Sequence, residues 1–408
     1  MTEFDIRNYG AVADGKTVNT KAIQSAIDDC ASQGGGRVII NGGVFVTGTI
    51  FMKSNVDLCI EPNATLKASA NTDDYPDFPC EEFNVKAAPR ATAKCIIYFG
   101  YIENASLTGM GKIDCNGSAF CDPVYNENGV ATEYIRNTLL VPARMVFIMG
   151  CTNINVENIT MREMAGGWGY WINNSQYITF SKVKLYCNPL YPNADGIHIN
   201  CSSDVTVDSC IVHSGDDSII IRANTNTLHE KRVCERIIVK GCSLSSHHQA
   251  VRIGWRNDGV IKNCVLSDLV IAKTRVGIAI ELPDHSSPTD FGDNPTVVEN
   301  IHINNVILDE VEDMPIKMVV YPENMYGKFK NVRFSNITSS SGQYPLVIGR
   351  PDAVIEDVYF DNCKFTVKGM KKFPDRQTSF FANVKGLHLN NTTFDVIDDK
   401  VEEVNYYE

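Results

Sequence analysis

Three features are missing from this chain of 408 residues, and each absence narrows the class of protein. No run of about 18 apolar residues occurs, so a membrane-spanning helix is not expected. The stretch from Met1 to Asp5 lacks the basic and apolar regions of a secretory signal, so we expect a cytoplasmic location, or secretion if a signal has been removed. No CxxC pair and no zinc-type spacing of Cys and His occurs, so we expect no metal and no cofactor.

Basic residues are also scarce, because 37 Lys and Arg stand against 49 Asp and Glu, which gives a net charge of −12. Nucleic acid and anionic membranes would repel such a chain, so we expect neither as a partner. The 14 cysteines are abundant, however. Since cytoplasmic thiols stay reduced and a free cysteine packs as a small apolar residue, we expect core thiols and no disulfides.

A single helical pattern stands near the start of the chain. In the segment 20–30, Ile23, Ala26, Ile27 and Cys30 share one face, Asn19 or Thr20 is the predicted N-cap, and the glycines at 34–36 end the helix. From residue 37 onward the period changes to short alternating segments bounded by Asn, Gly, Asp and Ser, which is typical of many short strands. The chain is therefore predicted to be all-β after one helix.

The strands repeat. The segment 153–159 recurs at 177–183, 204–210, 236–242, 300–306, 331–337 and 386–392. If one turn residue is assigned to each unit, and Asn263 is the turn residue of the fifth unit, successive turn residues lie 22 to 42 residues apart in the sequence. Such a drifting period favours a parallel β-solenoid over a propeller, whose blades need about 40 residues. Core-stack positions directly after a turn residue are predicted for Cys210, Cys242, Cys264 and Cys363.

No linker or charge block divides the sequence, so we expect one domain over residues 1–408. It comprises an N-terminal cap region at about 1–36, β-helix rungs at about 37–396 and an acidic tail at about 397–408. The helix is predicted to cap the open end of the solenoid and to block edge-to-edge pairing.

A second strand in each unit carries the chemistry. It aligns at 168–173, 195–200, 217–222, 249–254, 276–281 and 314–319. Equivalent positions in a solenoid stack about 4.8 Å apart, so Asp195 and Asp217 become neighbours, and Asp216 directly precedes Asp217. Like charges held together push one pKa upward, which lets one carboxyl act as an acid while its neighbours act as bases, as glycoside hydrolysis requires. Taken alone, these acidic motifs could equally cap turns or bind calcium.

Further side chains fall beside the predicted acid cluster. Aromatic plates and basic groups next to paired acids suit a sugar chain lying along a groove. The candidates are Trp168 and Trp171 on one side, and Arg222, Arg252, Arg256 and Lys317 on the other.

Two motifs resemble those of a known family. Asn193-Ala194-Asp195-Gly196 and Gly215-Asp216-Asp217 resemble the N-T-D and D-D motifs of glycoside hydrolase family 28, the polygalacturonases and their relatives. The stretch from Tyr9 to Ile27 is similar to the cap region of the same group, and the resemblance covers residues 5 to 395 approximately. It implies a right-handed parallel β-helix and an inverting mechanism without metal. It also implies that Asp216 is the general acid, that Asp195 and Asp217 activate water, and that Asn193 belongs to the binding site.

Two other family motifs are altered. Where the family has G-H-G-x-S-I-G, Gln249 aligns with the histidine and His248 lies one residue early, so His247 and His248 are candidates for substrate contact. Where the family has R-I-K, this chain has Ala279-Ile280-Glu281, and Glu281 would repel a galacturonate carboxylate. Arg252 and Lys317 occupy the arginine column on the flanking rungs. The sequence therefore allows two alternatives, in which these two residues bind the sugar carboxylate in place of R-I-K or the sugar at the cleavage site is neutral.

The preferred hypothesis is an inverting glycosidase that hydrolyses pectin-derived, uronate-containing oligosaccharides. A polysaccharide lyase or epimerase on the same scaffold, and a noncatalytic carbohydrate-binding solenoid, are the alternatives. A cytoplasmic enzyme would meet short substrates, which favours exo action, with the loops 224–233 and 284–295 closing one end of the groove. The sugar linkage and the oligomeric state, a homo-oligomer included, are left open.

Overall fold

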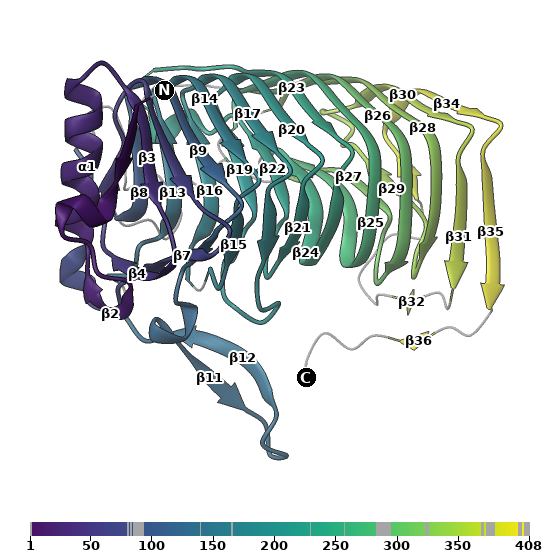
Figure 1. The fold of residues 1–408 in the computed structure, drawn as a ribbon. Coiled ribbons are helices and arrows are strands. Elements are labelled where there is room, and N and C mark those ends of the chain that lie inside the picture. Colours follow the sequence, from purple (N-terminus) through teal and green to yellow (C-terminus); the bar gives the residue numbers. More distant parts are fainter. Residues whose placement is uncertain are drawn as a thin grey trace.

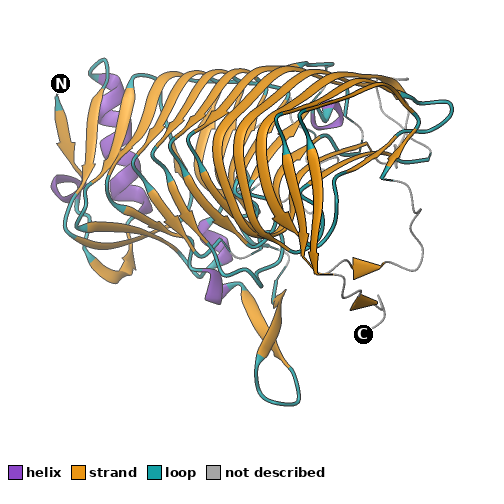
Figure 2. Ribbon diagram, turned by 90° about the vertical axis from the view of Figure 1, so that its right-hand side faces the viewer, coloured by secondary structure: helices purple, strands orange, loops and turns teal. Residues whose placement is uncertain are grey.

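The chain winds into a parallel β-helix, and α1 lies at its N-terminal end (Figures 1 and 2). The computed structural model describes residues 2–79, 81, 84, 94–138, 140–164, 166–228, 230–256, 258–282, 295–322, 326–368, 371–372, 380–398 and 402–403. Each rung contributes strands that pair in parallel with the rungs before and after it. The predicted all-β, right-handed parallel β-helix is confirmed.

The strands form three faces. The first face contains β1 (Glu3–Asp5), β3 (Gly36–Ile40), β6 (Val56–Ile60), β9 (Glu103–Gly109), β14 (Thr152–Glu157), β17 (Gln176–Ser181), β20 (Ser203–Asp208), β23 (Cys234–Lys240), β30 (Ile355–Asp361) and β34 (Val384–Asn390). The second contains β2 (Asp14–Val18), β4 (Gly43–Thr47), β7 (Ala64–Ala68), β10 (Lys112–Asp114), β15 (Thr160–Arg162), β18 (Lys184–Tyr186), β21 (Ile211–Ser214), β31 (Lys364–Lys368) and β35 (Thr393–Asp398). The third contains β5 (Ile50–Phe51), β8 (Cys95–Gly100), β13 (Arg144–Met149), β16 (Trp168–Asn173), β19 (Ile197–Asn200), β22 (Ile219–Arg222), β27 (Ile316–Val320), β29 (Leu346–Ile348) and β33 (Phe381–Ala382).

Four long strands turn the corners between faces, so that one strand belongs to two faces or all three. They are β24 (Ser243–Ile253), β25 (Val260–Leu282), β26 (Thr296–Val311) and β28 (Tyr326–Ser341). The third face carries the predicted acid cluster.

The helix α1 spans Thr20–Ser32 and buries the four residues predicted for its inner face, which confirms the amphipathic pattern. The N-cap residue is Asn19, one of the two predicted positions, but its side chain makes no cap bond and instead exchanges hydrogen bonds with the backbone of Val12, at 2.7 and 3.0 Å. Strands β1 and β2 pair with β3 and β4, so the first rung begins inside the segment predicted as cap. No helix in the described part of the chain is long and apolar enough to cross a membrane.

The cysteines of the described segments are all free thiols, and all but Cys187 are buried, which confirms their predicted place in the core. One detail of the repeat was wrong. Asn300 donates to Asn263 at 2.9 Å, and Asn305 donates to Asp268 at 2.6 Å, so Asp268 and not Asn263 is the turn residue of that unit. Cys264 therefore lies inside the first-face part of β25, where it pairs with Ile237 and Ile301.

Some elements lie outside the helix of strands. The hairpin of β11 (Cys121–Tyr125) and β12 (Ala131–Arg136), which the sequence did not predict, projects from the body (Figure 2). Strand β35 continues past the predicted start of the tail, and β32 (Lys371–Lys372) pairs with β36 (Glu402–Glu403). The remaining short elements are the 3-10 helices η1 (Ile6–Tyr9), η2 (Thr72–Asp74), η4 (Gly117–Ala119) and η5 (Thr225–Thr227). Nearly all of the 284–295 loop, and residues 399–401 and 404–408 of the tail, lie outside the described residues.

Candidate active site

The predicted acids lie together where the third-face strands begin. Strand β19 pairs with β22, and β22 pairs with β24. When this register is extended by two residues toward the N-terminus, Asp195, Asp217 and Gln249 fall in one column. The backbone confirms this placement, because the N–H of Gly196 donates to the carbonyl of Asp217 at 2.8 Å and that of Ser218 donates to the carbonyl of Gln249 at 3.1 Å.

The three carboxylates differ in surroundings. Asp195 and Asp217 are buried, with 2% and 0% exposed, whereas Asp216 is partly exposed. Asp217 lies 2.6 Å from Nη1 of Arg252 and accepts from the N–H of Gln249 at 3.2 Å. Asp216 accepts from the N–H of Asp217 at 3.0 Å and from Nδ2 of Asn193 at 3.3 Å. Oδ1 of Asp195 has no hydrogen-bond partner among the described residues.

Burial and mutual repulsion make this cluster hard to ionise. Burial raises the pKa of Asp195 well above its usual range, and the charges of Asp216 and Asp217 add to the shift. Burial also raises the pKa of Asp217 to about 7, while Arg252 opposes this shift. The cluster therefore keeps a proton near neutral pH, which is the electrostatic condition for acid and base chemistry in one site.

His248 lies beside the acids, whereas Gln249 turns away from them. One carboxylate oxygen each of Asp216 and Asp217 and one ring nitrogen of His248 lie within 4.8 Å of one another. These donors could hold a cation, which would have to compete with Arg252 for Asp217. The side chain of Gln249, which aligns with the family's histidine, donates instead to Oε2 of Glu281 at 2.7 Å.

Glu281 is the centre of a buried polar network. Its carboxylate pairs with Nζ of Lys317 and accepts hydrogen bonds from the hydroxyl of Tyr321 at 2.9 Å and from Gln249. Burial raises the pKa of Glu281, but Lys317 and these hydrogen bonds outweigh it, so the pKa lies below its usual value. The charge of Glu281 is therefore compensated inside the protein, which weakens the expected repulsion of a sugar carboxylate. Arg252, Ala279 and Lys317 do share one column, as the sequence indicated.

Trp168 and Trp171 do not form the open plates expected from the sequence. They are 5% and 1% exposed and belong to an apolar cluster that also contains Phe78 and Leu228. Phe78 and Leu228 come from irregular segments that fold over this part of the third face, and such non-local coverage leaves no periodic signal in the sequence. The half-buried ring of Trp255 lies beside Arg252, the partner of Asp217. The guanidinium of Arg252 lies over this ring, 5.0 Å from the ring centroid.

Arg222 and Arg256 are not brought to the acids by any contact described. Nε of Arg222 donates to both oxygens of buried Asp258, at 3.0 and 2.8 Å, and its Nη2 donates to the carbonyl of Arg256 at 2.8 Å. Arg256 is exposed. The placement of Arg222 in the groove is thus replaced by an internal ion pair that holds one corner of the rung.

The sequence reasoning missed two buried residues next to Asp195. Nδ1 of His198 lies 4.0 Å from Oδ2 of Asp195, and the imidazole stacks on Trp168 with centroids 3.9 Å apart. Burial, followed by nearby arginines, lowers the pKa of His198 well below its usual value. The guanidinium of Arg144 lies 3.6 Å from the centroid of Trp168. His198 could have been found from its place in the column of Trp171 and Arg252.

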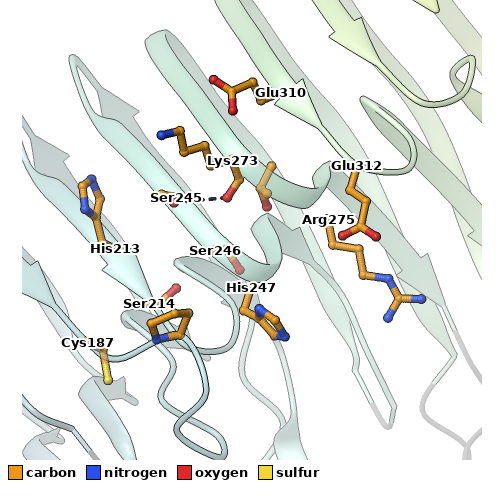
Figure 3. Close-up of a pocket in the computed structure, with 12 residues that line it drawn as sticks. Cys187, His213, Ser214, Ser245, Ser246, His247, Lys273, Arg275, Glu310 and Glu312 are labelled. Carbon is orange, nitrogen blue, oxygen red and sulfur yellow. Dashed lines mark hydrogen bonds between the residues drawn. The ribbon is translucent and has the colours of Figure 1, made fainter. Parts of the chain in front are cut away.

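Two hollows adjoin the cluster. One, of about 370 Å³, is lined by Asn193, Asp216, His247 and His248, with Tyr134 of the β11–β12 hairpin and Tyr191 as its aromatic wall. These two tyrosine rings meet edge to face at 4.8 Å. The other, of about 480 Å³, shares His247 and contains side chains from successive rungs (Figure 3). These include His213, Ser245, Lys273 and Glu310. Asp216 thus lies at the start of a longer polar surface.

A right-handed parallel β-helix with three clustered carboxylates beside polar hollows defines the class of carbohydrate-cleaving β-helix enzymes. The family model described as "Glycosyl hydrolases family 28" matches residues 30–379, and the chain belongs to this family of glycosidases.

One similar sequence and two similar solved structures extend the comparison. The chain is 25% identical over 436 residues to an exo-poly-alpha-D-galacturonosidase of Dickeya chrysanthemi, an alignment that covers 96% of this chain and 70% of the relative. Its fold is similar to that of a hyperthermoactive exopolygalacturonase from Thermotoga maritima, with a TM-score of 0.75, 18% identity and coverage of 97% and 92% of the two chains. A family 28 exopolygalacturonase of Yersinia enterocolitica gives a TM-score of 0.75, 20% identity and coverage of 98% and 77%.

Proposed function

We propose that this glycosidase is an inverting exo-hydrolase of galacturonate-containing oligosaccharides derived from pectin. The observation that carries the proposal is the arrangement of the three acids in a family 28 chain. Asp216 lines the 370 Å³ hollow, while Asp195 and Asp217 lie buried on adjacent rungs. The names of similar proteins, which include exo-acting galacturonosidases, support both the substrate and the mode of action.

The proposed mechanism follows from exposure and hydrogen bonding. Asp216, the acid that reaches the hollow, donates a proton to the glycosidic oxygen as the bond from that oxygen to the anomeric carbon breaks. A water attacks the anomeric carbon from the opposite face, and Asp195 and Asp217, which are ionised once the proton of the cluster lies on Asp216, take the proton that the water loses. Arg252 holds Asp217 in place through their 2.6 Å contact. One water is added across the bond, and the anomeric configuration inverts.

Exo action is supported by the covered part of the third face. Phe78 and Leu228 pack over Trp168 and Trp171, so sugar rings cannot lie on the rungs before Asp195 without displacing them. A hydrogen bond joins residues near Phe78 and Leu228, because the N–H of Asn84 donates to the carbonyl of Thr227 at 2.9 Å. With this side filled and the β11–β12 hairpin at the wall, the substrate would have room for few units beyond the cleavage point.

Recognition of the uronate is assigned to the column of basic side chains after Asp217. Arg252 and Lys317 lie in one column on either side of Ala279, and Lys317 retains 14% side-chain exposure beside its partner Glu281. A sugar carboxylate arriving here would share Lys317 with Glu281 and would gain a charge-assisted hydrogen bond.

Product analysis tests the proposal. Tetragalacturonate is incubated with the wild type and with Asp216→Asn, and reducing ends, products and ultraviolet absorbance are followed. We expect release of galacturonate monomer without absorbance by the wild type, and loss of at least a hundredfold in rate in the variant. An unsaturated, absorbing product would replace the proposal by a lyase, and no turnover of any pectic oligosaccharide would favour a binding protein.

A further inference from the structure

A hollow of about 620 Å³ lies at the far end of the third-face strands, away from the acids. Asp195 precedes β19 and Cys201 follows it, and six residues of extended chain span about 20 Å. The lining comprises Tyr101, Gly150, Cys151, Thr152, Asn174, Ser175, Gln176, Cys201, Ser203, Glu230, Lys231, Arg232, Val233 and Glu235. None of these residues lines the two hollows beside Asp216.

Tyr101 is the unusual member of this lining. Its φ of 53° lies in the left-handed region, and Gly150 and Asn174 hold the equivalent turn positions on the next two rungs with φ values of 62° and 48°. Glycine and asparagine tolerate this conformation, whereas a bulky side chain is strained there. Tyr101 is nevertheless 45% exposed, and its ring lies against Gly150, where a Cβ would come within 2.5 Å of it. The strained position thus presents a fixed aromatic ring to the hollow.

A second irregularity runs beside the hollow on the first face. Asparagines form a ladder there, in which Asn153 donates to Asn104 at 2.7 Å and Asn300 donates to Asn263 at 2.9 Å. Between Asn153 and Asn263 the same column is interrupted by Tyr177, Asp204 and Arg236. Tyr177 is 55% exposed and directly follows Gln176, which lines the hollow. The ladder is therefore replaced by a second exposed tyrosine on one of the rungs that form the hollow.

The remaining wall is polar but balanced in charge. Glu230 and Arg232 pair at 2.8 Å, and Glu235 pairs with Lys262 at 3.4 Å. The lining holds two acids and two bases, together with the amides of Asn174 and Gln176. An aromatic face combined with amides and balanced charges suits a ligand that has one apolar face and many hydroxyls.

We propose that this hollow is an accessory binding site for pyranose units of an oligosaccharide, with Tyr101 stacking on one sugar ring. The proposal does not depend on the chemistry at Asp216. Galactotetraose and tetragalacturonate share the pyranose ring, and they differ in the carboxylates that a balanced wall neither requires nor repels.

The test is a calorimetric titration of galactotetraose into the wild type and into Tyr101→Asn, accompanied by a titration of tetragalacturonate into an inactive background. Asparagine suits the left-handed backbone, so this variant should fold at least as well as the wild type while it lacks the ring. We expect galactotetraose to bind about tenfold more weakly to Tyr101→Asn, which corresponds to a stacking contribution of about 1.4 kcal/mol. Tyr101→Phe should retain wild-type affinity. Tyr125→Ala, which removes a tyrosine that is 62% exposed on the distant hairpin, is the matched control.

The tetragalacturonate arm shows whether the hollow also takes uronates. It is run in an Asp217→Asn background to prevent turnover, and the number of sites is counted with and without the Tyr101 ring. If two tetragalacturonate sites are counted with the Tyr101 ring and one without it, the hollow accepts uronates. One site in both, with Tyr101-dependent binding of galactotetraose, would mean that it takes neutral sugars. The proposal is overturned if neither tetrasaccharide shows binding that depends on Tyr101, and failure to hydrolyse tetragalacturonate would contradict only the proposed activity.

Discussion

Two Arg–Asp pairs whose arginines lie on third-face strands have opposite characters, and the arginine is buried in one pair and partly exposed in the other. Asp258 accepts from Nε of Arg222 with both oxygens and also from the N–H of Ala223 at 3.2 Å, so its carboxylate is saturated with donors. Asp217 has one 2.6 Å contact with Arg252 and one backbone donor, and it adjoins two further carboxylates. Under the proposed mechanism, the same pair of residue types serves as scaffold in one place and as reactive group in the other.

An ion pair in the protein interior is therefore by itself weak evidence of function, because structural ion pairs also perturb pKa values. What distinguishes the Asp217 pair is its crowding by like charges and the unsatisfied oxygen of neighbouring Asp195.

Removal of the charge at Asp217 should have the largest effect. Asp217→Asn keeps the shape of the side chain but removes a base, so we expect kcat on tetragalacturonate to fall by about 10²- to 10⁴-fold. Release of reducing ends measures the loss, and circular dichroism checks the fold. Activity within tenfold of the wild type would mean that Asp217 is as much scaffold as Asp258.

Asp258→Asn should have the reverse profile. The substitution leaves Arg222 buried without a full counter-charge, and breaking a buried pair costs about 3–5 kcal/mol of stability. We expect a lower unfolding temperature, with kcat per folded molecule within a few-fold of the wild type. An unchanged melting temperature combined with lost activity would invert the comparison.

The stability of the wild type should fall as pH rises toward neutrality. The pKa of Asp217 is about 7 in the folded protein, against about 3.9 for an unfolded aspartate, so its protonated form favours the folded state. This contribution is complete below pH 4 and is lost as pH rises through 7. Asp217→Asn should therefore flatten the dependence of the unfolding temperature between pH 5 and pH 8, and equal slopes in the two proteins would contradict the raised pKa.

A smaller effect is expected for Glu281→Gln. Glutamine can still bond with Tyr321 and Gln249, but it leaves the charge of Lys317 available to a sugar carboxylate. We expect kcat/KM for oligogalacturonate to rise a few-fold at low salt and the gain to shrink at high salt. Lys317→Met should lower kcat/KM under the same conditions, and an equal response of a neutral oligosaccharide to both changes would remove Lys317 from uronate recognition.

The sequence was sufficient where the repeat itself carries the information. The period of two along each strand predicted the stacking of Asp195 on Asp217 and the shared column of Arg252 and Lys317. It failed at Asn263, because Asn263 and Asp268 both lie in left-handed turn positions of the same rung, and both positions accept asparagine or aspartate.

Features outside the repeat could not be predicted in this way. Burial of Trp168 depends on Phe78 and Leu228, and Arg222 pairs with Asp258, which lies 36 residues away in the irregular connection between β24 and β25. The β11–β12 hairpin is an insertion with no counterpart in the other rungs that the structure describes. Such contacts depend on where loops fold back, which local periodicity does not encode.

The most direct test of the central claim is the configuration of the first product. Proton NMR recorded during hydrolysis of tetragalacturonate by the wild type would resolve the anomer before mutarotation. The account predicts an anomer opposite in configuration to the cleaved bond, released as monomer, and no such signal from Asp216→Asn. Retention of configuration, or an unchanged rate in Asp216→Asn, would contradict the assignment of these three aspartates.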